Sequence, residues 1–283
     1  MGEPVTRVPS LRVANARGDD TSRLIPDEVP VALVYDGSTH AVMMATPADL
    51  DDFALGFSLT EGVIQSIDEL RELEVVEHGN GIEARLWLVP QVGRMHAERR
   101  RRITGPTACG LCGVESLEAA VPEPRRVGST ARAAPLEIQR ALAEMPAAQS
   151  LNIATRAVHA AAFWDSTTSS LALLREDVGR HNALDKLVGA VARAKLDPGR
   201  GFVLLTSRVS VEMVQKTAQL GAEILVAVSA PTALAIRTAE KAGITLIAVA
   251  RSDAFEIFTH PERVALADTN DRNRPGDHSH AFV

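Results

Sequence analysis

Two cysteines three positions apart are the residues of this chain most suited to chemistry. Cys109 and Cys112 are its only cysteines, and they stand in the segment 105–113, GPTACGLCG. A glycine follows each thiol, which leaves the sulfur atoms uncrowded. The thiolate is the nucleophile in sulfur chemistry, and a Cys-x-x-Cys context can lower the pKa of a thiol. The spacing therefore favours a reactive thiol pair that the sulfur of another molecule can reach.

Three other interpretations of the pair compete with reactivity. A structural zinc site would be incomplete, because it needs four ligands and the chain has no second Cys-x-x-Cys. His78, His96 and His159 do not have the spacing of a zinc finger. A structural disulfide would close a very small loop and contribute little loop entropy. Two incidental cysteines in a turn remain the simplest alternative.

Four consecutive cations, Arg99–Arg102, lie just upstream of the thiols. Nearby cations favour the thiolate form of a cysteine. They also attract an anionic ligand. The alternative is a solvated charged segment with no ligand, and the sequence leaves both interpretations open.

Composition limits the classes of protein that fit. The chain has 283 residues, of which 46% are hydrophobic, enough for a packed core and about two domains. A formal charge of -6 and 4% aromatic residues argue against a nucleic-acid-binding protein. No stretch approaches the ~18 uninterrupted apolar residues of a membrane helix. The first residues lack the apolar region of a secretory signal, and a vicinal thiol pair fits the reducing cytoplasm.

Composition shifts along the chain predict the following domain organisation. Residues 1–28 form an N-terminal tail, and residues 29–121 form a smaller α+β domain that carries the Cys-x-x-Cys loop. Pro122, Pro124 and Pro135, with Gly128, mark a linker over 122–135. An α/β domain follows over 136–267, and a polar, disordered tail closes the chain over 268–283.

The first half alternates apolar runs with turn residues, which predicts an α+β arrangement. Asp36-Gly37 is a hairpin signal between two apolar runs. Thr46-Pro47 is typical of a helix N-cap followed by proline in the first turn. The predicted strands cover 31–35, 40–45, 73–76 and 82–88, and the predicted helix covers 48–60 with one apolar face.

The second half alternates predicted strands and helices, as an α/β domain does. Strands of near-continuous apolar residues are predicted over 171–174, 202–205, 224–228 and 244–249. Helices are predicted between them over 181–194, 211–220 and 232–242, the last two ended by Gly221 and Gly243. This βαβαβαβ order predicts a mostly parallel sheet covered by helices on both faces, a three-layer αβα domain.

Polar residues follow three of these strands, at the edge where such sheets bind ligands. Arg208 stands in the segment after the second strand, and Arg251 follows the last one. Helix starts at Ser210 and Thr232 would offer free N–H groups to a phosphate, although each residue could be only a helix cap. These ends predict an anionic, nucleotide-like ligand, but the chain has no GxGxxG and no GxxxxGK[ST] motif.

The densest polar cluster is DVGRHNALDK, residues 177–186, at a strand-to-helix turn. We expect Arg180, His181, Asp185 and Lys186 to face the same ligand. The alternative is local capping and an ordinary helical ion pair. His159, in an alanine-rich segment, is more typical of a core histidine.

Five motifs, taken in order, closely resemble the FdhD family of formate dehydrogenase accessory proteins. They are CGLCG at 109–113, DVGRHNALDK at 177–186, SRVSVEMVQK at 207–216, SAPTALA at 229–235 and THPER at 259–263. Thr46-Pro47 and the TEG of residues 60–62 match as well. The resemblance runs from about Val29 to Val264.

The resemblance implies a sulfur carrier. A cysteine desulfurase would pass persulfide sulfur to Cys109, the first of the pair. The carrier would give it to the molybdenum cofactor, bis(molybdopterin guanine dinucleotide), before the cofactor enters formate dehydrogenase. The resemblance also implies a homodimer, a second domain similar to the cytidine deaminase fold, and guanine nucleotides such as GDP as mimics of the cofactor. Its cofactor-binding segment corresponds to Val249, Ala250, Arg251, Ser252, Asp253 and Ala254.

The sequence departs from the family pattern inside that segment. Ala250, Asp253 and Ala254 stand where relatives often carry bulkier or basic residues, and Phe258 replaces a usual tyrosine. Deaminase zinc chemistry is not expected, because His159-Ala160-Ala161 lacks the glutamate of an H-x-E motif. Two other functions use the same features: a Cys-x-x-Cys thiol-disulfide oxidoreductase, and a non-catalytic molybdoenzyme chaperone. The oxidoreductase would need its thiols at the start of a helix that follows a strand.

Overall fold

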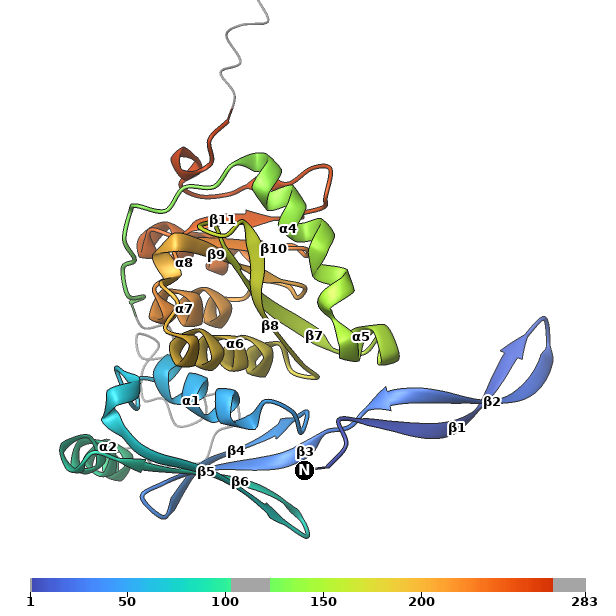
Figure 1. Ribbon diagram of the computed structural model, residues 1–283, viewed down its shortest axis with the longest axis horizontal. Helices are drawn as coiled ribbons and strands as arrows, with labels where there is room; N and C mark the ends of the chain where they lie inside the picture. The colour runs from blue at the N-terminus through green and yellow to red at the C-terminus, as the bar shows by residue number, and fades with distance from the viewer. Residues whose placement is uncertain (1, 103–122, 267–283) are drawn as a thin grey trace, which may run out of the picture.

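The computed structural model describes residues 2–102 and 123–266, which form two layered bodies joined helix to helix (Figure 1). Cys109, Cys112 and the predicted tail 268–283 lie outside these residues, so the predictions made for them are not tested by the fold. Within the described ranges, no helix has the length and apolar character needed to cross a membrane.

The smaller body is a four-stranded sheet with one helix on its inner face. Its strand order is β4-β3-β6-β5, in which β3 and β6 run parallel and each pairs with an antiparallel outer strand. Alternate residues of β6 are buried, so one face of the sheet meets the core and the other meets solvent. The strands are β3 (Val29–Tyr35), β4 (Ser38–Ala45), β5 (Leu70–His78) and β6 (Gly81–Leu88).

The predicted hairpin turn at Asp36-Gly37 is confirmed. Both residues have positive φ, 47° and 78°, as a two-residue turn matched to the twist of the strands requires. The Asp36 carboxylate also accepts a hydrogen bond from the backbone N–H of Leu88 at 3.1 Å, which ties the turn to the central strand β6.

Helix α1 (Leu50–Thr60) covers the inner face of this sheet and begins later than predicted. Its N-cap is Asp49, so the assignment of Thr46 as the cap is wrong. Thr46 is instead buried between the two bodies, where its backbone N–H donates to Asp177 and its hydroxyl accepts from the N–H of Val178. A short 3-10 helix, η1 (Ile67–Glu69), and helix α2 (Pro90–Arg102) complete the body.

The larger body is built on a six-stranded sheet of order β12-β11-β10-β9-β7-β8. Strands β9, β10 and β11 are parallel to one another, as predicted. The edge strand β12 is antiparallel to β11. The strands are β7 (His159–Asp165), β8 (Ser170–Asp177), β9 (Gly201–Leu205), β10 (Ile224–Ala227), β11 (Thr245–Ala248) and β12 (Glu256–Ile257).

Strand β7, which the sequence did not predict, lies between β8 and β9 and is antiparallel to both. The sheet is therefore mixed, and the expectation of a mostly parallel sheet is wrong for this half of it. Because two antiparallel pairings separate β8 from β9, these two strands still point the same way. The carboxyl ends of β8, β9, β10 and β11 thus share one edge, together with the start of β7.

Helices cover both faces of this sheet, so the predicted three-layer αβα domain is confirmed, while the likeness to the cytidine deaminase fold stays an expectation. Helices α6 (Arg180–Ala194), α7 (Val211–Leu220) and α8 (Ala233–Ala242) pack on one face. The unpredicted helix α4 (Pro135–Ala148) packs on the other, followed by α5 (Ser150–Thr155). Short 3-10 helices η2 (Pro198–Arg200) and η3 (Pro261–Arg263) lie in connections.

The two bodies meet where α1 packs on α6 (Figure 1). Two glycines allow this close approach. A Cβ atom added at Gly56 would lie 1.7 Å from the carbonyl oxygen of Asp185, and one at Gly189 would lie 1.9 Å from that of Asp52. No side chain fits at either position, so the two backbones touch directly.

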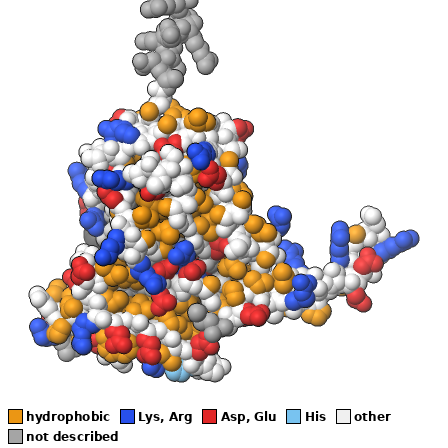
Figure 2. Space-filling view, viewed as in Figure 1, with side chains coloured by type: hydrophobic (Ala, Val, Ile, Leu, Met, Phe, Trp, Pro, Cys, Tyr) orange, Lys and Arg blue, Asp and Glu red, His pale blue; other side chains and the backbone are white. Residues whose placement is uncertain are grey.

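Residues expected as a tail form a projecting hairpin, strands β1 (Val5–Ala14) and β2 (Arg17–Pro26) (Figure 1). Arg23 at its base donates to the carbonyl oxygen of Thr155 at 3.2 Å. Figure 2 shows several basic side chains along this arm. The segment 123–134, within the predicted linker, contains no helix or named strand, and its Ala131 and Ala133 are buried in the core beneath α4.

Candidate functional site

Three loops at the carboxyl edge of the larger sheet form the candidate ligand site. They follow β9, β10 and β11, and they are tied together through their backbones. Val209 donates its N–H to the carbonyl oxygen of Ala230 at 3.3 Å, and Thr232 donates to that of Val209 at 3.0 Å. The sequence predicted these loops as the ligand edge, and the fold brings them together.

The two predicted phosphate-binding helix starts differ in their hydrogen bonds. The Thr232 hydroxyl accepts from the N–H of Ala235 at 3.1 Å, so it acts as an ordinary cap of α8. Ser210 is the N-cap of α7, but its side chain makes no capping bond. Burial would raise the pKa of the Glu212 carboxyl, but the Ser210 hydroxyl helps to lower it, so the two helix starts use their side chains differently.

The segment 249–254 begins with a strained residue. Val249 has φ 51°, in the left-handed region that a β-branched residue rarely enters. Backbone bonds on both sides hold it there, from Val249 to Ser229 and from Ala250 to Ala227. Such strain costs ~1–3 kcal/mol and is concentrated at functional sites. The Val249 side chain is 39% exposed beside the loops described above.

The other residues of this segment divide into exposed and buried. Arg251, Ser252, Asp253 and Ala254 are exposed, whereas the Ala250 side chain is buried in the core, so only its backbone is left for a ligand. One guanidinium nitrogen of Arg251 donates to the carbonyl oxygens of Val228 and Ala250, at 2.5 and 2.8 Å. Arg251 thereby braces the turn after β11. Arg208 is exposed after β9 at the same edge.

The polar cluster of residues 177–186 does not face one ligand as expected. Lys186 and Asp177 form a fully buried ion pair at 2.7 Å. Lys186 also donates to the carbonyl oxygen of Thr46 at 3.0 Å, and Asn182 donates to that of Met44 at 2.8 Å. These bonds cross from the larger body to the smaller one. This half of the motif therefore joins the two bodies.

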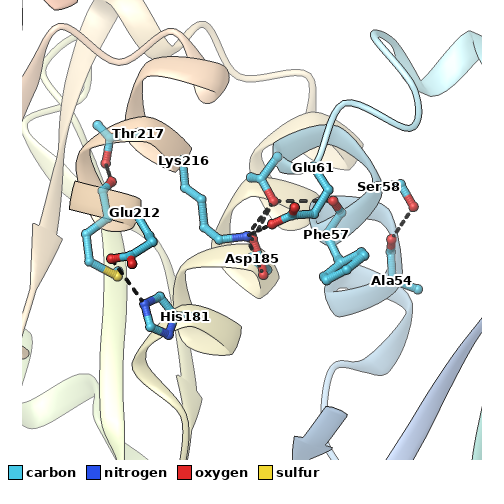
Figure 3. Close-up of polar contacts among 11 residues, drawn as sticks. Ala54, Phe57, Ser58, Glu61, His181, Asp185, Glu212, Lys216 and Thr217 are labelled. Carbon is cyan, nitrogen blue, oxygen red and sulfur yellow. Dashed lines mark hydrogen bonds and ion pairs between the residues drawn. The ribbon is translucent and has the colours of Figure 1, made fainter. Parts of the chain in front are cut away.

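Asp185 belongs to a second buried junction, shown in Figure 3. Lys216 on α7 reaches its carboxylate at 2.9 Å and that of Glu61 at 2.9 Å. Thr60, at the end of α1, donates to Asp185 at 2.7 Å. Burial alone would lower the pKa of Lys216, but the carboxylates of Asp185 and Glu61 outweigh it and raise that pKa, so the ammonium stays charged. Of the four residues expected to face a ligand, Arg180 and His181 are the two that stay partly exposed at this edge.

His159 opens β7 at this same edge and is half-buried, so its interpretation as a core histidine is wrong. Its neighbour Ala160 accepts a hydrogen bond from the backbone N–H of Thr206, the first residue after β9, and donates its own N–H to the Thr206 hydroxyl at 2.9 Å. Burial, and then the charge of Arg180, lower the pKa of the His159 ring. Sequence reasoning could not place it, because an alanine-rich run gives a weak strand signal.

Among known proteins, the chain matches the FdhD/NarQ family over residues 26–265. The chain belongs to this family. It is 53% identical over 247 residues to a sulfur carrier protein FdhD of Agrobacterium fabrum, covering 86% of this chain and 90% of that protein. It is 49% identical over 240 residues to one of Cupriavidus necator, covering 85% and 83%.

A solved structure shows that the FdhD fold is shared across distant sequences. The crystal structure of a candidate formate dehydrogenase accessory protein from Desulfotalea psychrophila superposes with a TM-score of 0.72. The match covers 93% of this chain and all of that one, at 22% identity. At this identity the likeness concerns the fold alone, and it spans both bodies.

Proposed function

We propose that this FdhD family member is a sulfur carrier, a sulfurtransferase that moves persulfide sulfur from a cysteine desulfurase to the molybdenum cofactor before the cofactor enters formate dehydrogenase. The observation that carries this proposal is the 53% identity over 247 residues to a protein named as a sulfur carrier. The reactive pair Cys109 and Cys112 supplies the chemistry.

The loading step is a thiol exchange in which atoms and electrons balance. The Cys109 thiolate attacks the outer sulfur of a cysteine persulfide on the desulfurase. A new S–S bond forms at Cys109, the S–S bond of the desulfurase breaks, and its cysteine leaves as a thiolate. The outer sulfur keeps its proton throughout, so Cys109 now bears a persulfide.

The release step needs two electrons, because persulfide sulfur must become sulfide to bind molybdenum. The Cys112 thiolate supplies them by attacking the inner sulfur of the Cys109 persulfide. The outer sulfur leaves as hydrosulfide toward the metal, and a Cys109–Cys112 disulfide remains. A dithiol reductant then returns the pair to thiols. This assigns a separate role to each cysteine.

The cofactor, bis(molybdopterin guanine dinucleotide), is the substrate of the second step, and we place its binding at the carboxyl edge of the larger sheet. Supporting observations are the strained turn at Val249, the exposed polar residues that follow it, and the cations Arg208 and Arg251. Guanine nucleotides such as GDP serve as mimics of its nucleotide ends. We further propose that the carrier works in the cytoplasm as a homodimer.

Formate dehydrogenase activity in cells that lack the endogenous carrier tests this function. Wild-type protein should restore activity, and Cys109→Ala should not, although its fold and GDP binding are unchanged. Full activity with Cys109→Ala would contradict sulfur transfer and favour a chaperone that only binds the cofactor and the enzyme. A thiol-disulfide oxidoreductase would instead act through the same two cysteines without a desulfurase, so unchanged activity in cells that lack the desulfurase would favour it.

A further inference from the structure

The projecting arm of β1 and β2 has one apolar face, and the outer half of that face is open to solvent. Alternate residues of a strand share a face, and directly paired residues of two strands lie on the same side. The apolar face of the arm comprises Val5, Pro9, Leu11, Val13 and Leu24. Leu11 and Val13, near the tip, are 63% and 67% exposed. A two-stranded ribbon is only marginally stable alone, so this face calls for a second surface.

The opposite face and the edges of the arm are polar. Ser10, Arg12 and Thr21 lie on the opposite face. Pro9 leaves β1 without one N–H donor, and the charged side chains of Asp19 and Asp20 discourage another strand from pairing with β2. The apolar face, and not an added strand, is therefore the part of the arm suited to a contact.

The arm is held at its base and carries its tip away from its own body. Arg23 donates to the carbonyl oxygen of Thr155 at 3.2 Å, and the backbone N–H of Asp27 donates to that of Pro4 at 2.9 Å. Beyond these bonds, two strands of ten residues each extend ~33 Å, at ~3.3 Å per residue. Figure 1 shows the outer half of the arm projecting clear of both bodies. The surface that covers the tip therefore belongs to another molecule.

The chain itself carries an apolar surface near the base of the arm. Val42 and Met44, on the outer face of β4, are 54% and 49% exposed, and Ile153 of α5, the helix that contacts β2, is 59% exposed. We call these three residues the basal patch. Figure 2 shows hydrophobic side chains gathered where the arm joins the body. An apolar tip and an apolar patch on one chain are what a self-complementary, two-fold interface needs.

Charge and size also favour a second copy as the partner. The arm, residues 5–26, has four arginines and two aspartates, so it is positive in a chain of formal charge -6. Opposite net charges on the arm and on the rest of a second copy favour their association. A stable interface takes about 20–30 residues from each partner, which matches the two ten-residue strands of the arm.

We propose that the apolar face of each arm packs on a second copy of this chain, with Leu11 and Val13 on the basal patch of that copy. The two arms then run in opposite directions across a two-fold axis, so that each tip meets the base of the other arm. This arrangement gives two identical contacts. The inference rests on the homodimer in the proposed function and names the element that forms it.

Sedimentation equilibrium of the full-length protein tests the role of the arm. Wild-type protein should dimerise, and Leu11→Glu/Val13→Glu should raise the dimer dissociation constant by at least about 10-fold, the effect of losing one interface anchor. Ser10→Glu/Ala14→Glu is the matched control, because it adds the same charge to the opposite face. A dimer that the first variant leaves intact, or an equal loss in both variants, would overturn the proposal while the homodimer stands. A monomeric wild type would overturn both.

Photo-cross-linking tests the contact without removing it. Val13→p-benzoylphenylalanine protein is mixed with isotope-labelled wild-type chains and irradiated, and the joined peptides are identified by mass spectrometry. The probe should react with labelled peptides of the basal patch, and the same probe at Ala14 should react with few or none. In cells, cross-links to nucleic acid or to a different protein, with none to a second copy, would overturn the proposal. Sulfur loading of Cys109 is measured separately, so failure here leaves sulfur carriage standing.

Discussion

At the residue scale, Arg251 has a structural role that its sequence context did not show. Its guanidinium was predicted as a phosphate ligand, and it lies at the predicted edge, but it also donates to two backbone carbonyl oxygens. Those bonds fix its position before a ligand arrives, which limits the entropy lost on binding. The same side chain can both brace the strained turn and present its outer nitrogens to an anion.

We therefore predict that Arg251→Ala weakens GDP binding by about 1.5–3 kcal/mol, the scale of a hydrogen bond to a charged group. Isothermal titration calorimetry at low and moderate salt measures this. Arg200→Ala, which removes an equally exposed cation from the opposite edge, should change affinity little. GDP binding that is unaffected by loss of Arg251 would remove it from the ligand site.

Single residues also mark where sequence reasoning failed. Asp185 and Lys186 looked like ligand-binding groups because they stand in a polar run at a strand-to-helix turn. They are buried at the junction instead, since their partners, Thr46 and Lys216, come from positions far away in the sequence. No local sequence pattern reveals a partner that distant. A polar run that forms a structural ion pair therefore cannot be distinguished by sequence from one that binds a ligand.

At the element scale, helices and strands with a strong apolar periodicity were predicted correctly, and those with a weak one were missed. Strands β9, β10 and β11 with helices α6 to α8 were found within two residues of their predicted ends, because their apolar patterns are strong and glycines end α7 and α8. Strand β7 was missed because its core is three alanines, which have low strand propensity. Helix α4 was missed because it follows a proline-rich segment that was assigned to the linker.

The contact between α1 and α6 gives a prediction at this scale. Gly189→Ala should lower the free energy of unfolding by about 3 kcal/mol, because the added Cβ overlaps the carbonyl oxygen of Asp52 and no flexible side chain can yield. In an ordinary exposed helix the same change stabilises by up to ~1 kcal/mol, so the sign is diagnostic.

Urea unfolding of Gly189→Ala measures this, with Gly79→Ala as the control. Gly79 lies in the exposed turn between β5 and β6, where an added Cβ meets nothing within 4 Å. Equal midpoints for Gly189→Ala and wild type would show that α1 and α6 do not pack as closely as described.

At the scale of the whole molecule, the chain is two bodies fixed together by buried polar bonds, with the ligand edge beside the junction. The ion pair of Lys186 with Asp177 and that of Lys216 with Asp185 both lie there. The sequence predicted two halves of different character, but it could not predict that one motif serves both the junction and the edge. In the folded chain, the buried residues of the segment 177–186 form the junction, and Arg180 and His181 lie at the ligand edge.

Stability should depend on pH through the histidines of the ligand edge. Burial and the charge of Arg180 lower the pKa values of His159 and His181 below the unfolded value of about 6.5. The unfolded chain therefore binds protons more readily, so stability is retained above that value and falls as the pH drops through it. Thermal unfolding between about pH 7.5 and 5.5 should show a falling Tm.

His181→Gln provides the comparison for this effect, because glutamine does not titrate. Its Tm should fall less steeply over the same pH range than that of the wild type. Parallel curves for the two proteins would show that His181 does not carry a lowered pKa.

Mass spectrometry of the thiol pair tests the central claim, sulfur carriage, most directly. The protein is incubated with a cysteine desulfurase and cysteine, alkylated and digested. The account predicts one additional sulfur atom on Cys109 in wild type and in Cys112→Ala, and none in Cys109→Ala. Additional sulfur found only on Cys112, or on neither cysteine while the desulfurase itself bears a persulfide, would contradict it.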